Sequence, residues 1–243
     1  MRQLFRAKPK SFLDEARRRW QFEAFAWLLR GCGGYPRFLD TTLVLPVEEH
    51  FPDPGMKGHA AAAALFRRVR DHAGMADWPC IAEPATASGV PEPAPGESGR
   101  LRVIRYPPDA VPELQVALFA RELARYLVET FDEPPPCGAP LYEHAVDLAA
   151  VFLGFGVFMA NSSAQQAQWS LNEGELLHAL ALFCHLRKLP EEAAAPHLNA
   201  HVRKYLRLAL QDLARYEADF GRLRSVVPAG PHTGECTLPT HQG

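Results

Sequence analysis

The stretch Arg121-Glu-Leu-Ala-Arg125, followed by Glu143-His-Ala-Val-Asp147, decides the fold of this chain. Each stretch places charged side chains one helical turn apart within an apolar segment, so both stretches are predicted to be helical. Carboxylates that are buried together without a cation would repel one another. The pattern therefore predicts two facing helices that bring together Arg121, Glu122, Arg125, Glu143 and Asp147.

The flanking sequence supports this arrangement. Leu101-Arg-Val-Ile-Arg-Tyr106 alternates apolar and polar residues and predicts a short strand just before the first charged helix. That helix is expected from about Pro112 to Thr130 and is apolar on most sides. The segment Asp147–Ala160 is apolar and contains glycine, which favours a second buried helix.

The two charged stretches resemble the active site of a gluzincin metallopeptidase, written HExxH followed by ExxxD. In this resemblance Arg121 and Arg125 stand where the two zinc-binding histidines would be, and Glu122 stands at the general-base position. Glu143 matches the third zinc ligand, and Asp147 matches the acidic residue that orients a ligand histidine.

The resemblance extends to an uncharacterised bacterial family that carries the motif HELAH, and it covers about residues 20–215. It rests on four further segments: Thr42-Leu-Val-Leu-Pro46, Phe51-Pro-Asp-Pro54, Phe152-Leu-Gly-Phe-Gly-Val-Phe158 and Glu175-Leu-Leu-His-Ala-Leu-Ala-Leu-Phe183. The family implies a zincin-like fold and a peptidase activity. The two arginines are where this chain departs from the family.

The arginines remove the basis for zinc chemistry. Arginine stays protonated and offers no lone pair, so Arg121 and Arg125 cannot ligate a metal. We therefore expect no metal, no cofactor and no catalytic residue at this site. The two guanidiniums supply a charge of +2 and suit bidentate pairing with carboxylates, so we expect a buried ion-pair cluster.

Three functions are compatible with this sequence. The first is a catalytically inactive, metallopeptidase-derived protein that binds a protein or peptide partner, or regulates one, through strand addition at Leu101–Tyr106. The second is an active metal-dependent hydrolase in which His144, His178 or His197 turns towards Glu122. The third is a purely structural interaction module whose cleft has closed.

Other candidate motifs are expected to be structural. They are His197 with His201 at i, i+4 spacing on one helix, the neighbours Cys184 and His185, and the pair Gly154 and Gly156. No glutamate follows His197, so the His197 and His201 pair lacks the general base of a zinc peptidase motif. Cys184 and His185 are adjacent on a helix, so their side chains point in different directions. The glycines lie in an apolar run without a phosphate-loop pattern, so they are expected to permit close helix packing.

The composition of the chain limits its expected partners and cellular compartment. The chain has 243 residues, of which 47% are hydrophobic and 22% charged, and its net charge is -2. This charge gives no reason to expect nucleic acid or a membrane as partner. The N-terminus lacks a signal-peptide apolar region, and the longest apolar run, Leu148–Ala160, is too short to cross a bilayer. Five cysteines without a CxxC pair favour a reducing, cytoplasmic setting.

The expected fold is a mainly helical α+β domain of zincin-like type, with about six helices and two or three short strands. Residues 1–224 are predicted to form one domain, which includes a Pro-rich loop at 79–100, and residues 225–243 a disordered tail. Other expected elements are a first helix capped by Ser11, a strand at 41–45, a helix at 58–72, a helix from near Leu141, a helix capped by Asn172 with Glu175, and a long last helix at 193–223.

Overall fold

The computed structural model describes residues 11–53, 55–85, 101–163 and 169–229. Its elements in chain order are α1 Glu15–Gly31, α2 Gly34–Phe38, α3 Gly58–His72, β1 Cys80–Pro84, β2 Arg102–Tyr106, α4 Pro112–Val128, α5 Tyr142–Ala150, α6 Gly156–Ser162, α7 Glu173–Leu186, α8 Ala200–Leu213 and α9 Glu217–Arg224. Short 3-10 helices span Ala139–Leu141, Glu191–Ala193 and Ala195–His197, and a π-helical turn spans Val151–Phe155. The predicted α+β, mainly helical class is confirmed, with nine α-helices over the described residues in place of about six.

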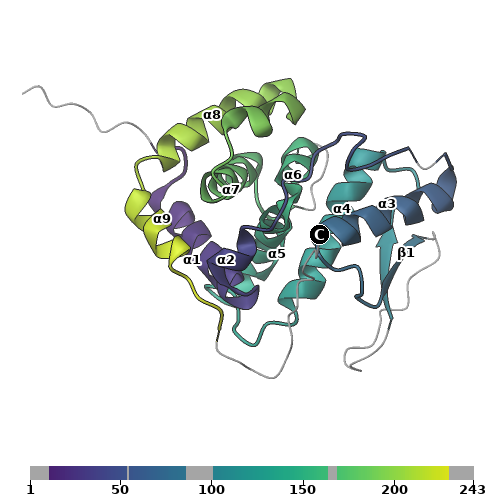
Figure 1. Cartoon of the computed structure of the whole chain (residues 1–243), viewed down its shortest axis with the longest axis horizontal. Coiled ribbons are helices and arrows are strands. Elements are labelled where there is room, and N and C mark those ends of the chain that lie inside the picture. The colour runs from purple at the N-terminus through teal and green to yellow at the C-terminus, as the bar shows by residue number, and fades with distance from the viewer. Residues whose placement is uncertain (1–10, 54, 86–100, 164–168, 230–243) are drawn as a thin grey trace, which may run out of the picture.

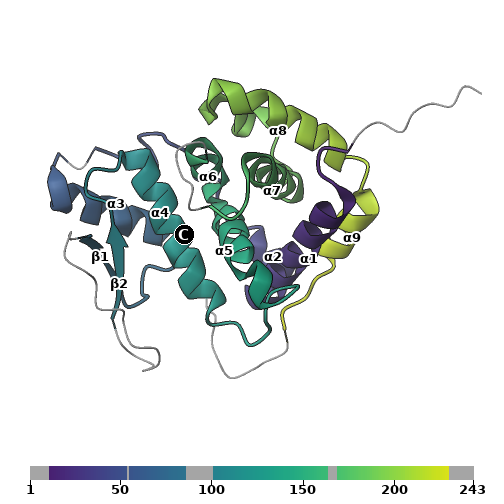
Figure 2. The same cartoon turned by 180° about the vertical axis from the view of Figure 1, so that it is seen from behind.

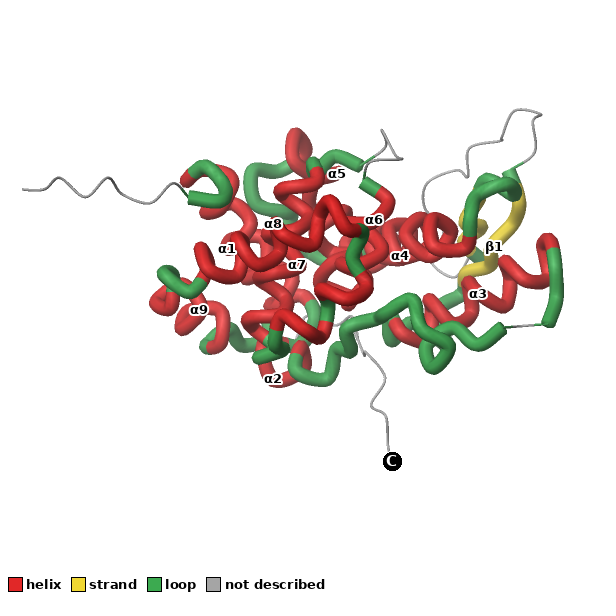
Figure 3. The backbone as a smooth tube through the Cα atoms, turned by 90° about the horizontal axis from the view of Figure 1, so that it is seen from above, coloured by secondary structure: helices red, strands yellow, loops and turns green. Residues whose placement is uncertain are grey.

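Helix α4 separates the two halves of the molecule (Figure 1). On one side it packs against α5, within a group of helices that also contains α1, α6, α7, α8 and α9. On the other side it contacts α3 and β2, and the two strands lie together at that end of the protein (Figure 3). Helix α4 is therefore held between the helical half and the sheet.

The sheet consists of two parallel strands over the described residues. The strand predicted at Leu101–Tyr106 is confirmed as β2, which pairs with β1 in the register Cys80↔Arg102 to Pro84↔Tyr106. Ile104 and Tyr106 are buried, and the Tyr106 ring packs against Phe119 of α4 at a centroid distance of 5.4 Å. The alternation of exposed and buried residues thus fixes one face of the sheet on α4.

Strand β1 corrects the prediction of a loop over 79–100. Residues 80–84 form a strand whose buried side chains, Cys80 and Ala82, are small. Small residues between prolines gave little strand signal, because strand propensity reflects large β-branched and aromatic side chains. The rest of that predicted loop, residues 86–100, lies outside the described residues.

The centre of the helical half is the helical run from Ala139 to Ser162. It is long and apolar enough to cross a membrane, but its most apolar window is 94% buried within the protein. Its side chains join one continuous apolar cluster with those of the surrounding helices. Burial on nearly all sides explains why this run is apolar apart from the charged residues at its start, so this composition reflects a core helix.

The strand predicted at residues 41–45 is wrong. This segment runs extended against the π-helical turn, where the Val44 amide donates to the Gly154 carbonyl at 3.0 Å. Gly154 has φ +100°, and a Cβ there would lie 2.1 Å from the Thr42 carbonyl oxygen. Glycine is required at this position both for its conformation and for the close approach. The apolar pattern of 41–45 therefore reflects packing on a helix and not pairing in a sheet.

One further boundary differs from the prediction at the N-terminal side. The first helix is capped by Asp14, whose carboxylate accepts a hydrogen bond from the Arg17 amide at 2.9 Å, and not by Ser11. Ser11 instead contacts the Tyr216 hydroxyl at 3.3 Å. Both residue types are good caps, so only tertiary contacts decide between them.

The long last helix predicted at 193–223 is divided. Two 3-10 helices precede α8, and a turn at residues 214–216 separates α8 from α9. Pro196 accounts for the late start of α8, since proline disrupts a helix interior. The Ala-Arg-Tyr sequence at 214–216 carries no breaker signal; the turn lets α9 pack on α1.

The beginning of the predicted disordered tail is ordered. The Tyr35 amide donates to the Val226 carbonyl at 3.1 Å, and the Ala229 amide donates to the Arg30 carbonyl at 3.1 Å. Residues 226–229 are therefore tied to the end of α1 and to α2. The remainder of the tail, residues 230–243, lies outside the described residues.

The predictions for α3, α4, the start of α5 and the cap of α7 are confirmed, whereas the helix expected over Asp147–Ala160 is interrupted at the π-helical turn Val151–Phe155. Helix α3 has the predicted bounds, and α4 ends within two residues of the expected position. A 3-10 helix at Ala139–Leu141 leads into α5, close to the expected start at Leu141. The predicted capping box is present: the Asn172 side chain accepts from the Glu175 amide at 3.0 Å, and the Glu175 carboxylate accepts from the Asn172 amide at 2.8 Å.

Candidate functional site

Helices α4 and α5 carry the five charged residues that the sequence singled out. Arg121, Glu122 and Arg125 lie on α4, and Glu143 and Asp147 lie one turn apart on α5. The two helices pack against each other near the middle of the molecule (Figure 2). The structure brings all five residues into one cluster, which we call the arginine–carboxylate cluster.

Arg121 is the buried centre of the cluster. Its Nε donates to Oδ1 of Asp147 at 2.6 Å, and its Nη2 donates to Oε2 of Glu143 at 2.6 Å. Only 9% of the Arg121 side chain is exposed. One guanidinium thus bridges carboxylates on two successive turns of α5.

Arg125 pairs with Glu143 through two parallel hydrogen bonds. Its Nη1 donates to Oε1 at 2.7 Å, and its Nη2 donates to Oε2 at 2.7 Å. This fork is the strongest arrangement available to a guanidinium and a carboxylate. The hydrogen bond to Glu143 raises the pKa of Arg125, and the hydrogen bond from Arg125 is the main cause that lowers the pKa of Glu143 to about 2.

Asp147 is completely buried and joins three segments of the chain. Its Oδ1 accepts from Arg121, while its Oδ2 accepts from the backbone amides of Ser170 at 2.6 Å and Leu171 at 2.9 Å. Burial raises the pKa of the Asp147 carboxyl, and the Arg121 charge and the two amides act in the opposite direction. This carboxylate connects α4, α5 and the segment that leads into α7.

Glu122 has the weakest contacts of the three acids in the cluster. Its Oε1 lies 3.8 Å from Nη1 of Arg121, and its Oε2 lies 3.6 Å from Nε of Arg125. Both distances are too long for hydrogen bonds. One third of the side chain, 33%, is exposed. Glu122 therefore keeps acceptor capacity on the solvent side.

The residues at this site do not fit the zinc ion that the metallopeptidase resemblance implies. Both histidine positions hold guanidiniums, which donate hydrogen bonds and have no lone pair for a metal. Both oxygens of Glu143 already accept from Arg121 and Arg125. Across the part of the chain that the structure describes, no three His, Cys, Asp or Glu side chains are grouped so that they could hold a metal.

Two of the three histidines considered as replacement ligands, His144 and His178, have side-chain contacts with residues of α1. The His144 ring packs edge-on against Trp20 at 6.1 Å. His178 is buried in α7, where its Nδ1 lies 2.7 Å from the Gln21 side-chain oxygen, and burial lowers its pKa to about 3. His197 lies in the 3-10 helix that precedes α8.

The other residue pairs are structural in this fold. The prediction that His197 and His201 share one helix is wrong, because α8 begins at Ala200, and His201 pairs with Glu173 on α7 at 3.2 Å. Burial raises the pKa of the Cys184 thiol to about 12, which keeps it protonated and unreactive. Its neighbour His185 stacks on Phe220 at 3.8 Å.

Sequence reasoning missed the backbone contribution to the cluster. Ser170 and Leu171 act through their amides, which leave no side-chain signal. Trp169 was also missed, although the Arg121 guanidinium carbon lies 5.6 Å from the centroid of its ring. The capping box at Asn172 marks the helix start just beyond these residues, and this was the one signal that pointed to the segment.

The cluster is continuous with the sheet. Arg102 at the start of β2 forms an ion pair with Glu129, the residue that follows α4, and its guanidinium carbon lies 4.8 Å from the centroid of the Tyr126 ring. Glu122 and Arg125 are close enough to Arg102 to affect its pKa. The exposed side of the cluster therefore borders the first residue of β2.

Comparisons of the chain with protein-family models, with curated proteins and with solved structures found no match. Function is therefore inferred from the residues of the site and their surroundings.

Replacing Arg121 by Met should destabilise the protein far more than replacing Arg125 by Met. Without Arg121, the fully buried Asp147 loses the one charged partner that it has among the described residues, which costs about 3–5 kcal/mol. Without Arg125, the partly exposed Glu143 keeps its bond from Arg121, so the cost is about 1 kcal/mol. Urea unfolding at pH 7 measures both.

The double variant Arg121→Met, Asp147→Asn supplies the control. It removes the buried charge together with its partner, so it should recover part of the stability lost in the single variant. Equal, small losses in both arginine variants would show that the cluster does not hold the helices together.

The stability contributed by Glu143 should depend on pH. Its pKa falls from an ordinary value of 4.5 to about 2 on folding. The contribution is therefore fully present above about pH 4.5 and is lost as the pH falls towards 2. Solvent screening of this partly exposed group limits it to about 1 kcal/mol.

Glu143→Gln is the variant that tests this dependence. The difference in unfolding free energy between wild type and Glu143→Gln should be constant from pH 7 to 5 and should shrink below pH 4.5. The matched control is Glu133→Gln, which removes an exposed carboxylate that forms a similar fork with Arg30. A difference for Glu143→Gln that grows with acidity would contradict the assignment.

Proposed function

We propose that this chain is a catalytically inactive, zincin-like protein of metallopeptidase origin, in which the arginine–carboxylate cluster replaces the zinc centre. The observation that carries the proposal is the double pairing of Glu143 with Arg121 and Arg125. These are the residues at the third-ligand and the two histidine positions of the HExxH and ExxxD pattern. Two guanidiniums supply positive charge where a zinc ion would. Their charge explains how carboxylates can be kept at this site without a metal.

The placement of the elements supports the zincin-like part of the proposal. Zincins keep a short strand before the motif helix and a second helix with the third ligand, and here β2 precedes α4, which packs on α5. Asp147 holds Arg121 from one turn beyond Glu143, in the position of the acid that orients a ligand histidine.

The proposed role is binding of an extended peptide along β2. Arg102 donates its amide to the Pro79 carbonyl, and the Tyr106 carbonyl accepts from the Ala85 amide, so residues 102, 104 and 106 bond towards β1. Val103 and Arg105 consequently direct their backbone groups to the other edge, which pairs with no described strand. Strand addition needs such backbone groups and no metal.

Two observations weigh against the alternatives. An active hydrolase would need new ligands near Glu122. The His144 ring packs on Trp20, His178 lies beside Gln21, and His197 lies in the 3-10 helix before α8. A purely structural module would have closed its cleft over Glu122, whereas this side chain is 33% exposed. The cytoplasm is the proposed location, and it is supported by the free thiols of Cys80, Cys137 and Cys184.

Changing Arg121 and Arg125 together to His should create zinc binding where the parent protein has none. Two imidazoles on α4 and the Glu143 carboxylate then converge as three ligands, provided that the two helices keep a zincin-like spacing. Either single variant should be less stable than both the parent and the double variant, because one arginine then remains beside a lone imidazole. Zinc titration calorimetry of the four proteins measures this.

Adding Glu143→Gln to the double variant is the matched control, since it removes one ligand and should return zinc affinity to the parent level. A well-folded double variant with no gain in zinc affinity would sink the proposal of a zincin-derived site. Near-stoichiometric metal in the parent protein, lost together with a hydrolytic activity, would also contradict it.

Unfolded casein labelled with a fluorophore should bind the parent protein and remain uncleaved. Val103→Pro should weaken this binding at least about fivefold, because proline lacks the amide that faces the open edge. The fold should persist, since the Val103 amide does not pair with β1. Fluorescence anisotropy measures binding, and gel electrophoresis shows whether the casein stays intact.

Val103→Thr serves as control, because it keeps the amide and the β-branched shape while changing the side chain. Equal binding by the proline and threonine variants would exclude strand addition at β2. Absence of casein binding to the parent would favour the structural module.

A further inference from the structure

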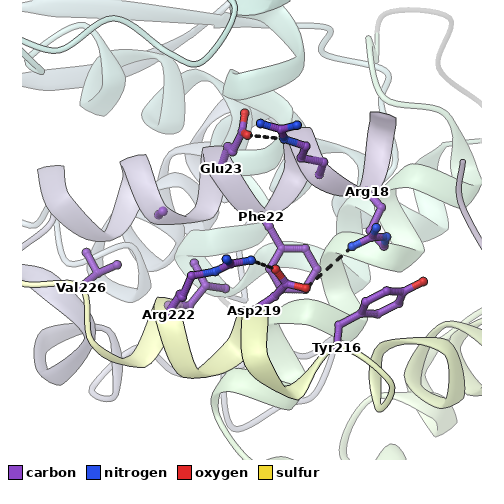
Figure 4. Close-up of a pocket in the computed structure, with 10 residues that line it drawn as sticks. Arg18, Phe22, Glu23, Tyr216, Asp219, Arg222 and Val226 are labelled. Atoms are coloured by element: carbon purple, nitrogen blue, oxygen red, sulfur yellow. Dashed lines mark hydrogen bonds and ion pairs between the residues drawn. The ribbon is translucent and has the colours of Figure 1, made fainter. Parts of the chain in front are cut away.

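A groove of about 500 Å³ lies between α1 and α9 (Figure 4), and none of its lining residues belongs to the arginine–carboxylate cluster. It is lined from α1 by Arg18, Arg19, Phe22, Glu23 and Ala26, and from the other side by Tyr216, Asp219, Arg222, Leu223 and Val226. The volume lies within the range of small-molecule sites, about 300–1,000 Å³.

The inner surface of the groove is apolar. Phe22 and Leu223 are buried, with 7% and 3% of their surface exposed, and Ala26 and Val226 extend the same lining. The Phe22 ring packs edge-to-face against the rings of Phe220 and Tyr216, at centroid distances of 5.2 Å and 6.5 Å. These contacts hold the Phe22 side of the groove in place. Such a lining suits a hydrocarbon chain or ring and gives no specificity for charge.

Charge is concentrated around Asp219. This carboxylate lies between two guanidiniums, those of Arg222, with which it forms an ion pair and a hydrogen bond, and Arg18, at 3.9 Å (Figure 4). Arg19 and Glu23 form a separate pair at 2.9 Å that is already balanced. Two positive charges therefore share one negative charge, which leaves a net charge of +1 around Asp219.

Arg18 is prepared to hold a second acceptor. Its side chain is only 14% exposed, and its guanidinium carbon lies 4.0 Å from the centroid of the Tyr216 ring. Its Nε is buried and has no acceptor within the described part of the chain. Its one carboxylate contact, to Asp219, is beyond hydrogen-bond distance. The terminal nitrogens of Arg18 are not among the buried atoms, and one of them faces Asp219, so these are the donors that an incoming anion can reach.

We propose that this groove binds a small amphipathic monocarboxylate, such as a medium-chain fatty acid. The carboxylate is received by Arg18 and Arg222 beside Asp219, and the apolar body lies along Phe22, Leu223 and Val226. A guanidinium has more donors than one carboxylate uses, so Asp219 and the ligand share the two arginines. The site does not depend on the function proposed above for α4 and α5.

Octanoate is the probe, with octylammonium of equal length and acetate without the apolar body as comparisons. Isothermal titration calorimetry on the full chain should show octanoate binding, and no binding of the other two at the same concentrations. Arg222→Gln removes the excess positive charge and should weaken octanoate binding about fivefold, the loss expected for one exposed charge pair. The Arg222 side chain is 79% exposed, so folding should not suffer.

Ala26→Phe fills the apolar end of the groove and should abolish octanoate binding while acetate remains without effect. Arg207→Gln is the matched control, because Arg207 is also exposed and paired with a glutamate, Glu191, but lies on α8. Its octanoate affinity should equal that of the parent. Circular dichroism confirms that each variant is folded.

Three results would overturn the proposal: no octanoate binding to the parent protein, octylammonium binding as tightly as octanoate, or octanoate affinity unchanged in both Arg222→Gln and Ala26→Phe. Weakening in both groove variants together with an unchanged Arg207→Gln supports it.

Discussion

The hydrogen bonds of the Arg121 guanidinium set the register of α4 on α5, and the central part of the structure depends on them. The guanidinium is nearly buried and contacts Glu143 and Asp147 on successive turns of the same helix. A slip of α5 by one turn, about 5.4 Å, would separate it from one of these acids and leave a buried charge unpaired. Apolar packing alone would tolerate such a slip more readily, because leucine and alanine surfaces are alike from turn to turn. We infer that the cluster contributes specificity of packing more than net stability.

A guanidinium and a metal ion satisfy the same carboxylates in different ways. A zinc ion accepts lone pairs, can be removed by a chelator, and can hold a water molecule at an open position. A guanidinium donates protons from a fixed position on its own helix and leaves no open position for water. In this chain the two guanidiniums therefore neutralise the carboxylates without a metal ion. Neither Arg121 nor Arg125 can activate a nucleophile. Glu122, in contrast, keeps the solvent exposure that a peptide-facing residue would need.

Most of the central architecture could be predicted from sequence because its signals are local. The apolar pattern around the RELAR stretch, the alternation in β2 and the capping box at Asn172 each depend on neighbouring residues, and each was found where expected. The pairing of Asp147 with Arg121 followed from charge, since a buried acid needs a cation.

What could not be predicted depends on contacts between distant segments. The 41–45 segment has a strand-like pattern, but its partner is a helical turn, and no local signal distinguishes the two. The turn between α8 and α9 has no glycine or proline, so packing of α9 on α1 decides it. The hydrogen bonds from Ser170 and Leu171 to Asp147 are made by backbone amides, which every residue except proline possesses.

The contact between Val44 and Gly154 has a consequence for the order of folding. This hydrogen bond closes a loop that spans nearly half of the chain, and its closure is entropically expensive. The 41–45 segment can dock only after the π-helical turn has formed and Gly154 has taken its positive φ. During synthesis the 41–45 segment therefore emerges long before its docking surface, the turn around Gly154, exists. This docking requires the residues around Gly154 to have been synthesised. Contacts between residues so far apart in the sequence are associated with slow folding.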